Sequence, residues 1–98
     1  MANGKEVILP AARKDAATRL NRIEGQIKGI RKMVEEGRYC VEVLGQISAV
    51  HEALRGVGKL IMRNYLENCV TSSLRSGSKE KAKKVYEELM DAVYKFAK

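Results

Sequence analysis

Apolar residues recur at helical spacing along most of the chain. In the first third they fall every three or four residues, on one stripe of a helix; the stripe consists of Leu20, Ile23, Ile27, Ile30 and Val34. Gly37 follows at the position where glycine commonly ends a helix. We therefore predict a first helix that begins near Ala16 and ends before Gly37. A flexible arm over residues 1–12, interrupted by Pro10, is expected to precede it.

A second and much longer helix is predicted from about Tyr39 to about residue 74. Its apolar stripe continues over most of this stretch and consists of Cys40, Leu44, Ile47, Val50, Leu54, Val57, Ile61 and Tyr65. The stripe also runs across three glycines, each of which costs about 1 kcal/mol relative to alanine inside a helix. At about 1.5 Å per residue this helix would be roughly 50 Å long. A chain of 98 residues cannot cover such a helix by itself, so we expect a second copy to pack against it.

Ser78 is the predicted N-cap of a third helix. The apolar face of this helix consists of Val85, Leu89, Ala92 and Phe96. No run of four to eight residues alternates apolar and polar positions with β-branched side chains, as a strand would. The fold class is therefore all-α, a three-helix protomer with a long central helix, in which residues 13–98 form a single domain.

Length and composition limit the protein to one small domain with a thin core. The chain has 98 residues, of which 45% are hydrophobic, and a formal net charge of +7. Domains of this size commonly add disulfides, a metal or a partner subunit, and two cysteines close at most one bridge, so oligomerisation is favoured. No stretch approaches the roughly 18 apolar residues of a membrane span. We expect a cytoplasmic protein with reduced thiols and no membrane partner.

Cys40 and Cys69 fall on nearly the same face of the predicted central helix. They lie 29 positions apart (69 minus 40), which is about eight turns plus roughly 20° and about 43 Å along the axis of a uniform helix. Two antiparallel copies crossing near Leu54 would place Cys40 of each chain beside the partner's Cys69. N–H groups at the start of the helix favour the thiolate form of Cys40, so we expect Cys40 to be the more reactive sulfur. Cys69 is then expected to be its resolving partner. The alternative interpretation is that both cysteines are simply small buried hydrophobic side chains without a sensing role.

The same two thiols could bind a soft metal ion such as Cu(I). A third ligand on the same face would stand four residues before Cys69, where the chain has Tyr65, a poor ligand for Cu(I) or Zn(II). The only histidine, His51, is 11 residues from Cys40 and 18 from Cys69 and is expected to be structural or solvent-facing. The residues therefore predict no complete three-ligand metal site and no bound cofactor.

Basic residues are frequent on the first two predicted helices. Arg55 and Lys59 lie four positions apart on the central helix, and Arg22 lies in a basic stretch of the first. An oligomer would multiply this positive charge, and the total would be sufficient to bind a phosphate backbone. The alternative is that the charged residues are simply solvated surface, which explains most charge runs and is what we expect for residues 79–84. No helix-turn-helix, zinc-finger or RNA-binding signature is present. Any DNA contact would therefore come from helix faces of an oligomer.

Four stretches carry a resemblance to a known family: RLNRIEGQIKGIRKM at 19–33, YCVEVLGQISAV at 39–50, YLENC at 65–69 and EELMDAV at 87–93. They resemble the copper-sensitive operon repressor family, the CsoR/RcnR/FrmR-type proteins, over roughly residues 13–96. This resemblance implies an antiparallel four-helix-bundle dimer that pairs into a homotetramer. It also implies a repressor that releases operator DNA when its inducer binds, with Arg19 contacting DNA. We add Arg22, Arg55 and Lys59 to the candidate DNA-binding residues because of their positive charge and the helix faces on which they lie.

The family's inducer site can be carried over residue by residue. Its copper sensors use a Cys from one subunit with a His four residues before a second Cys, and a Tyr and a Glu support that histidine. Cys40 and Cys69 match the two thiols, and Tyr39 and Glu88 match the supporting residues, but Tyr65 stands in the histidine position. Nickel and cobalt sensors use further histidines, and formaldehyde sensors lack the second Cys. Two thiols without the histidine resemble the persulfide-sensing, CstR-like branch.

Membership of that branch implies a low-molecular-weight persulfide or polysulfide as inducer. Cys40 would take up sulfane sulfur, and the partner's Cys69 would resolve the product into a di-, tri- or tetrasulfide link between subunits, with loss of DNA affinity. The alternative within the same class is a Cu(I) sensor that uses the two thiolates alone. A small thiol enzyme is disfavoured because no base, oxyanion donor or C-x-x-C motif is present. A purely structural helical oligomer would show no salt-dependent DNA binding.

Overall fold

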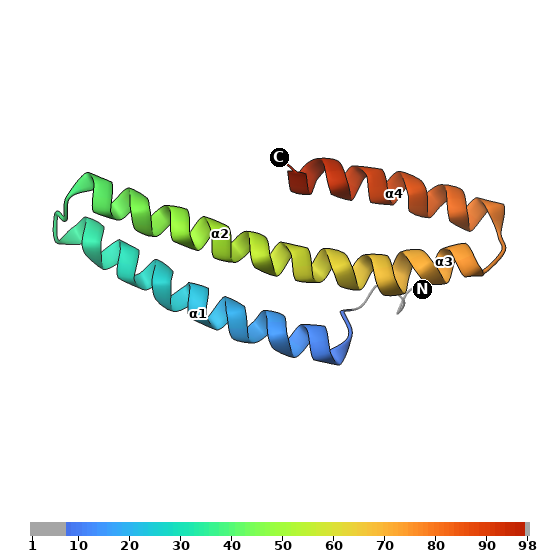
Figure 1. Cartoon of the computed structure of the whole chain (residues 1–98), viewed down its shortest axis with the longest axis horizontal. Coiled ribbons are helices and arrows are strands. Elements are labelled where there is room, and N and C mark those ends of the chain that lie inside the picture. Colours follow the sequence, from blue (N-terminus) through green and yellow to red (C-terminus); the bar gives the residue numbers. More distant parts are fainter. Residues whose placement is uncertain (1–7, 98) are drawn as a thin grey trace. The chain divides into compact units, whose positions relative to one another are not determined.

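The computed structural model describes residues 8–97, and its regular elements are all helical (Figure 1). They are α1 (Pro10–Glu35), α2 (Cys40–Asn64), the π-helix η2 (Tyr65–Val70), α3 (Thr71–Arg75) and α4 (Lys79–Ala97). No strand occurs within these residues. The predicted all-α, three-helix protomer is confirmed, and its central helical stretch, from Cys40 to Arg75, is the longest. Across residues 8–97, each helix is too short or too polar to cross a membrane.

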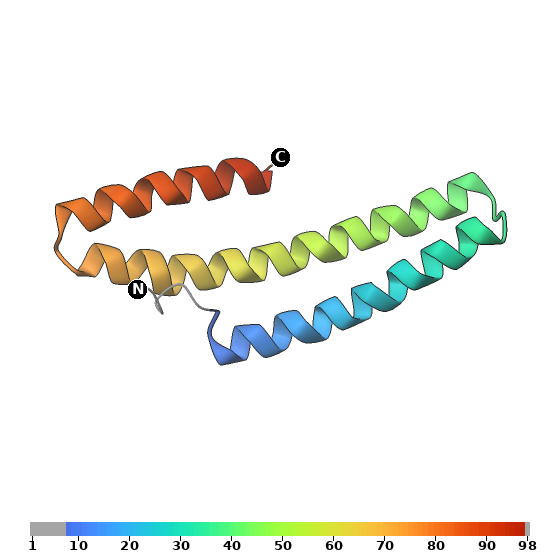
Figure 2. The same cartoon turned by 180° about the vertical axis from the view of Figure 1, so that it is seen from behind.

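The chain divides into two compact units. Residues 10–60 form the first unit, a hairpin in which α1 and most of α2 lie side by side and antiparallel (Figures 1 and 2). The second unit runs from residue 61 through η2, α3 and α4, and residues 8 and 9 belong to it. Cys40 lies in the first unit and Cys69 in the second.

Helix α1 begins at Pro10, six positions before Ala16, where the apolar pattern had placed its start. The interpretation of Pro10 as an interruption within a flexible arm is wrong. Proline suits the first position of a helix because its φ angle is already helical and its missing N–H would have no acceptor there. Residues 1–7 of the predicted arm lie outside the described residues.

Gly37 ends the first helix as the sequence predicts. Its φ angle is 71°, in the left-handed region that glycine enters at no steric cost. The Gly37 N–H donates to the Val34 carbonyl at 3.1 Å, and the Arg38 N–H donates to the Met33 carbonyl at 3.0 Å. This pair of bonds is the Schellman pattern, which satisfies carbonyls that the end of a helix would otherwise leave without partners.

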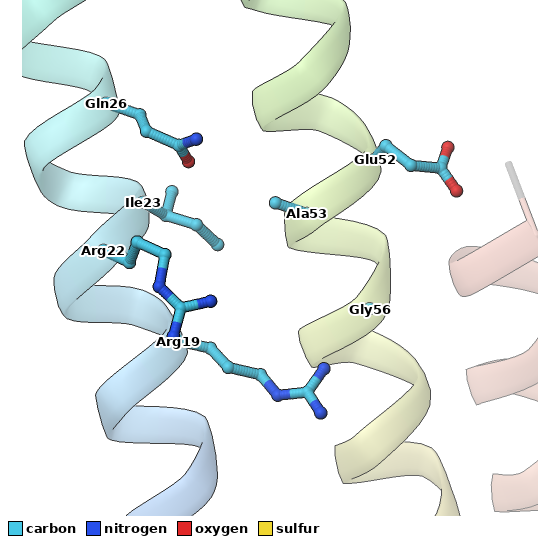
Figure 3. Close-up of a pocket in the computed structure, with 7 residues that line it drawn as sticks. All are labelled: Arg19, Arg22, Ile23, Gln26, Glu52, Ala53 and Gly56. Atoms are coloured by element: carbon cyan, nitrogen blue, oxygen red, sulfur yellow. The ribbon is translucent and has the colours of Figure 1, made fainter.

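Much of the apolar surface that predicted the first two helices remains exposed in a single chain. Ile23 and Val57 are buried, and Figure 3 shows the side chains of Ile23 and Ala53 pointing toward each other between the helices. Six other members of the two stripes keep between 42% and 62% of their surface accessible; they are Leu20, Ile27, Val34, Leu44, Ile47 and Leu54. Large apolar surface of this extent marks an interaction site, in agreement with the expectation of a partner subunit.

The second unit departs from the uniform α-helix that the sequence predicts through residue 74. Residues Tyr65–Val70 form a π-helix, whose hydrogen bonds span five residues instead of four. Two side chains bond to carbonyls in and beside this turn: Asn68 Nδ2 donates to the Asn64 carbonyl at 3.0 Å, and Thr71 Oγ1 donates to the Leu66 carbonyl at 2.9 Å. Cys69 lies within this turn, so the uniform α-helix that underlies the predicted angle of roughly 20° between the two cysteines does not extend to Cys69.

Helix α4 returns alongside η2 and α3 (Figures 1 and 2) and contacts both. Gly77, with a φ angle of 76°, turns the chain, and Ser78 Oγ accepts the Lys81 N–H at 3.2 Å. The predicted N-cap at Ser78 is thus confirmed. Among the described residues of this unit, the buried apolar ones are Cys69, Val70 and Val85, so the second cysteine lies in its small core.

Candidate functional site

Cys69 is held inside the second unit, on the π-helix. It retains only 6% of its accessible surface, and its neighbour Val70 is also buried. π-Helical turns inside longer helices occur frequently at functional sites. The position of the Cys69 sulfur therefore depends on the hydrogen bonds that maintain this turn, and no pattern in the sequence indicated them.

Tyr65 stands one turn before Cys69 and bonds to α4. Its hydroxyl donates a hydrogen bond to Glu88 Oε1 at 2.6 Å. A hydroxyl-to-carboxylate bond of this length is charge-assisted and belongs to the stronger class of protein hydrogen bonds. The structure thus brings together three of the predicted site residues, Tyr65, Cys69 and Glu88, within one unit. The Tyr65 oxygen is already engaged by a carboxylate.

Cys40 has a different environment, because it is the first residue of α2 and is exposed. Tyr39 precedes it and is exposed, and the Tyr39 carbonyl accepts the N–H groups of Glu42 and Val43 at 3.0 and 3.2 Å. The predicted position of Cys40 in the first helical turn is confirmed. Its sulfur is open to a reagent or to a second protein chain, whereas Cys69 is enclosed.

A groove in the first unit contains two of the predicted DNA-binding residues. It has a volume of about 350 Å³ and is lined by Arg19, Arg22, Ile23, Gln26, Glu52, Ala53 and Gly56 (Figure 3). Arg19 donates from Nε to Asp15 Oδ1 at 3.0 Å, and Figure 3 shows its guanidinium extending toward α2 near Gly56. Arg55 and Lys59 are exposed on α2 outside this lining.

The histidine and carboxylate side chains add no further ligand cluster. His51 is exposed on α2, as expected from its position in the sequence. Among residues 8–97 of one chain, no group of three or more His, Cys, Asp or Glu side chains is arranged to hold a metal ion.

Comparisons with known protein families and with related sequences both point to transcriptional repressors. A family model described as metal-sensitive transcriptional repressor matches residues 12–95. The copper-sensing transcriptional repressor CsoR of Bacillus subtilis is 45% identical over 86 residues, covering 87% of this chain and 82% of that protein.

Solved structures show the same relationship. The copper-sensing repressor CsoR of Geobacillus thermodenitrificans, crystallised with Cu(I), has a TM-score of 0.86 and 37% identity and matches all of both chains. The nickel-responsive transcriptional regulator InrS has a TM-score of 0.71 and 33% identity, covering 98% of this chain and 99% of that one. Relatives of one fold thus respond to different metals. From the family match and these identities together, this chain belongs to the metal-sensitive transcriptional repressor family.

Proposed function

We propose that this protein is a repressor that binds operator DNA as a homo-oligomer and releases it when Cu(I) binds between subunits. The two metal-binding thiolates would be Cys40 of one chain and Cys69 of the partner subunit. The observation that carries the proposal is the presence of both thiols in a chain 45% identical to a copper-sensing repressor. Thiolate sulfur is a soft donor and favours Cu(I) among the biological metals.

The side chains present fit a two-coordinate Cu(I) site better than a three-coordinate one. The position four residues before Cys69 holds Tyr65, whose phenol oxygen is a hard donor. That hydroxyl donates to Glu88 at 2.6 Å, and breaking this bond would add to the cost of metal coordination. Two thiolates alone would hold the ion, and Cu(I) would supply the bridge that joins the two subunits.

The proposed assembly follows from the exposed stripe of the hairpin. Six large apolar side chains on α1 and α2 are each at least 42% accessible in the single chain. A second copy packed antiparallel would cover this stripe by two-fold symmetry, and it would supply the missing thiol. We extend the assembly to a homotetramer on the family resemblance.

Operator binding is assigned to the basic residues of the hairpin. Arg19 and Arg22 line one groove, and Arg55 and Lys59 add exposed charge on α2. With a formal net charge of +7 per chain, an oligomer would attract the phosphate backbone strongly. The family consists of transcriptional repressors, so a small thiol enzyme is not proposed.

Sulfane sulfur is the second candidate inducer, favoured by the absence of the family's histidine at Tyr65. The Cys40 thiolate would attack the outer sulfur of a persulfide RSSH, forming Cys40–S–SH and expelling RS⁻. The partner's Cys69 would then attack the Cys40 sulfur, forming a disulfide and expelling HS⁻. The net reaction consumes two thiols and RSSH and gives one disulfide, RSH and H₂S. If both cysteines first become persulfides, their condensation gives a trisulfide and H₂S.

An operator-release titration separates the two inducers. Reduced protein bound to a fluorescent operator is titrated anaerobically with Cu(I) and, separately, with polysulfide, and the intact mass is recorded at each endpoint. The proposal expects release by Cu(I) with no mass added to the reduced, demetallated chain, and loss of this response in Cys40→Ser and Cys69→Ser. Release by polysulfide alone, with a covalent dimer, would replace copper by the second candidate. No release by either reagent would refute both.

A further inference from the structure

Asn64 is a buried polar residue placed directly before the π-helix. Only 6% of its surface is accessible. Its side-chain oxygen Oδ1 accepts the backbone N–H of Leu9 at 3.1 Å and Nδ2 of Asn68 at 3.4 Å. Its backbone carbonyl accepts the same Asn68 group at 3.0 Å. One side chain therefore joins the π-helix to a segment 55 positions earlier in the chain.

Helix propensity and apolar burial give little reason for asparagine at this position. Asparagine is a weaker helix former than leucine or alanine, and burying an amide without its hydrogen bonds is costly. The Leu9 N–H lies outside α1, which begins at Pro10, so no helical carbonyl accepts it. Asn64 supplies that acceptor, and this contact is specific because it requires an oxygen at one point of the buried surface.

The Asn64–Leu9 hydrogen bond lies between the proposed sensing thiol and the helix that carries the proposed DNA-binding residues. Asn68 immediately precedes Cys69, the proposed sensing thiol. Leu9 immediately precedes Pro10, the first residue of the helix that carries Arg19 and Arg22. A change in the π-helix that moves Asn64 therefore acts on the backbone at the start of the DNA-binding helix, through one hydrogen bond and one peptide bond.

We propose that Asn64 is a positioning residue that couples the inducer thiol Cys69 to the start of α1. This inference rests on the proposed function, since it concerns how inducer chemistry at Cys69 reaches the DNA-binding surface. In the inducer-free protein the Asn64–Leu9 bond holds the entry to α1. When Cys69 becomes bonded to a second subunit, the π-helix shifts and the bond weakens, so the two states differ in a defined contact, as allosteric coupling requires.

The first test measures the Leu9 amide directly. Hydrogen exchange of Leu9 is recorded by NMR in the reduced protein and after anaerobic loading with Cu(I). We expect exchange at Leu9 to become about fivefold faster on loading, the factor for loss of one hydrogen bond of average net strength. In Asn64→Ala, exchange should be fast in both states. Unchanged Leu9 protection in copper-loaded wild type overturns the inference.

The second test measures operator affinity with and without Cu(I) in four variants. Asn64→Ala should reduce the inducer effect on affinity about fivefold, whereas Asn64→Asp keeps the acceptor oxygen and should preserve it. Leu9→Pro removes the donor N–H and should behave as Asn64→Ala does, while Leu9→Ala keeps it and should respond normally. A full inducer effect in both Asn64→Ala and Leu9→Pro contradicts the coupling role.

A third arm keeps this inference separate from the choice of inducer. In the Cys40→Ser variant, Cys69 is alkylated with iodoacetamide under partly denaturing conditions, and the protein is refolded. Leu9 exchange should rise after alkylation, and the rise should be absent when Asn64→Ala is added. If wild type releases no DNA with Cu(I) or polysulfide, the proposed function fails, and this arm still decides whether Asn64 couples Cys69 to Leu9.

Discussion

Under the proposed function, Tyr65 is the residue that distinguishes the two candidate inducers. A nitrogen donor at this position would complete a three-coordinate site with two thiolates, whereas the phenol is engaged with Glu88 at 2.6 Å. The same bond ties the helix that carries Cys69 to α4. In the proposed site, one side chain thus determines both the donor set and the contact between two elements.

Tyr65→His is predicted to strengthen Cu(I) binding by at least about tenfold, because imidazole adds a third good ligand. Tyr65→Phe is the matched control, which removes the hydroxyl and keeps the ring. It should leave the Cu(I) affinity unchanged and lower the free energy of unfolding by about 1 kcal/mol or less, since Glu88 is exposed. Competition with a Cu(I) chelator measures the affinity. Equal affinities for all three proteins would exclude the position from the metal site.

The sequence predicts the roles of some single residues correctly and of others wrongly or not at all. Gly37 and Ser78 were identified correctly because helix ends have local chemical requirements. Pro10 was misinterpreted because proline both breaks helices and begins them, and the first residues of α1 carry no apolar period. The Asn64–Leu9 bond joins positions 55 apart, so no local pattern could indicate it. The Tyr65–Glu88 pair could be suspected only from the family resemblance.

At the scale of elements, the π-helix is the feature that the apolar period could not predict. The stripe through Ile61 and Tyr65 fits an α-helix, and one additional residue in a turn changes the spacing by too little to be seen in a sequence. Polar side chains add hydrogen bonds within the turn: the Leu66 carbonyl accepts Thr71 Oγ1 at 2.9 Å in addition to the Thr71 backbone N–H. The structure that places Cys69 is therefore specified by neighbouring polar side chains.

Thr71→Val is predicted to destabilise the second unit by about 1 kcal/mol, because the Leu66 carbonyl would lose the hydroxyl and keep only the Thr71 backbone N–H as a donor. Thr71→Ser keeps the hydroxyl and should cost clearly less. Urea unfolding followed by circular dichroism measures the difference at a fixed protein concentration. If the valine and serine variants unfold at the same urea concentration, the hydroxyl bond does not maintain the π-helix.

The turn between α1 and α2 gives a second prediction about an element. Gly37→Ala forces a φ angle of 71° on a residue with a Cβ atom, which costs about 1–2 kcal/mol. Gly25→Ala is the control, since an added Cβ within α1 meets no atom within 4 Å in the single chain. It should stabilise the helix by about 0.5–1 kcal/mol. Thermal unfolding of both variants should shift in opposite directions, and a shift in the same direction would argue against the assigned turn.

At the scale of the whole molecule, the exposed hairpin stripe indicates that one chain is not the functional unit. Leu54→Glu should shift the protein toward monomers, because it places a charge where we expect two copies to cross. Ala49→Glu introduces the same charge at an exposed position of α2 that lies about 140° around the helix from Leu54, and it should leave the assembly intact. Sedimentation velocity measures both. A dimer or tetramer retained by Leu54→Glu would move the interface away from this part of α2.

We expect DNA binding likewise to require the assembled molecule. Arg19→Ala should weaken operator binding and lower the slope of log affinity against log salt by about one unit for each phosphate that is no longer neutralised. The substitution should hardly affect stability, since the Asp15 ion pair is exposed on both sides. Lys84→Ala, in the solvated run 79–84, should leave the slope unchanged. Equal slopes for wild type and both variants would remove Arg19 from the interface.

The proposed action of Cys40 and Cys69 across a subunit boundary is best tested by complementation. Cys40→Ser and Cys69→Ser chains are unfolded together, refolded as a mixture and bound to operator, and release is followed as the inducer identified for wild type is added. Neither variant alone should respond. The mixture should, because mixed dimers combine Cys40 from one chain with Cys69 from the other. A mixture as unresponsive as its separate components, despite proven subunit exchange, would refute a sensing site shared between subunits.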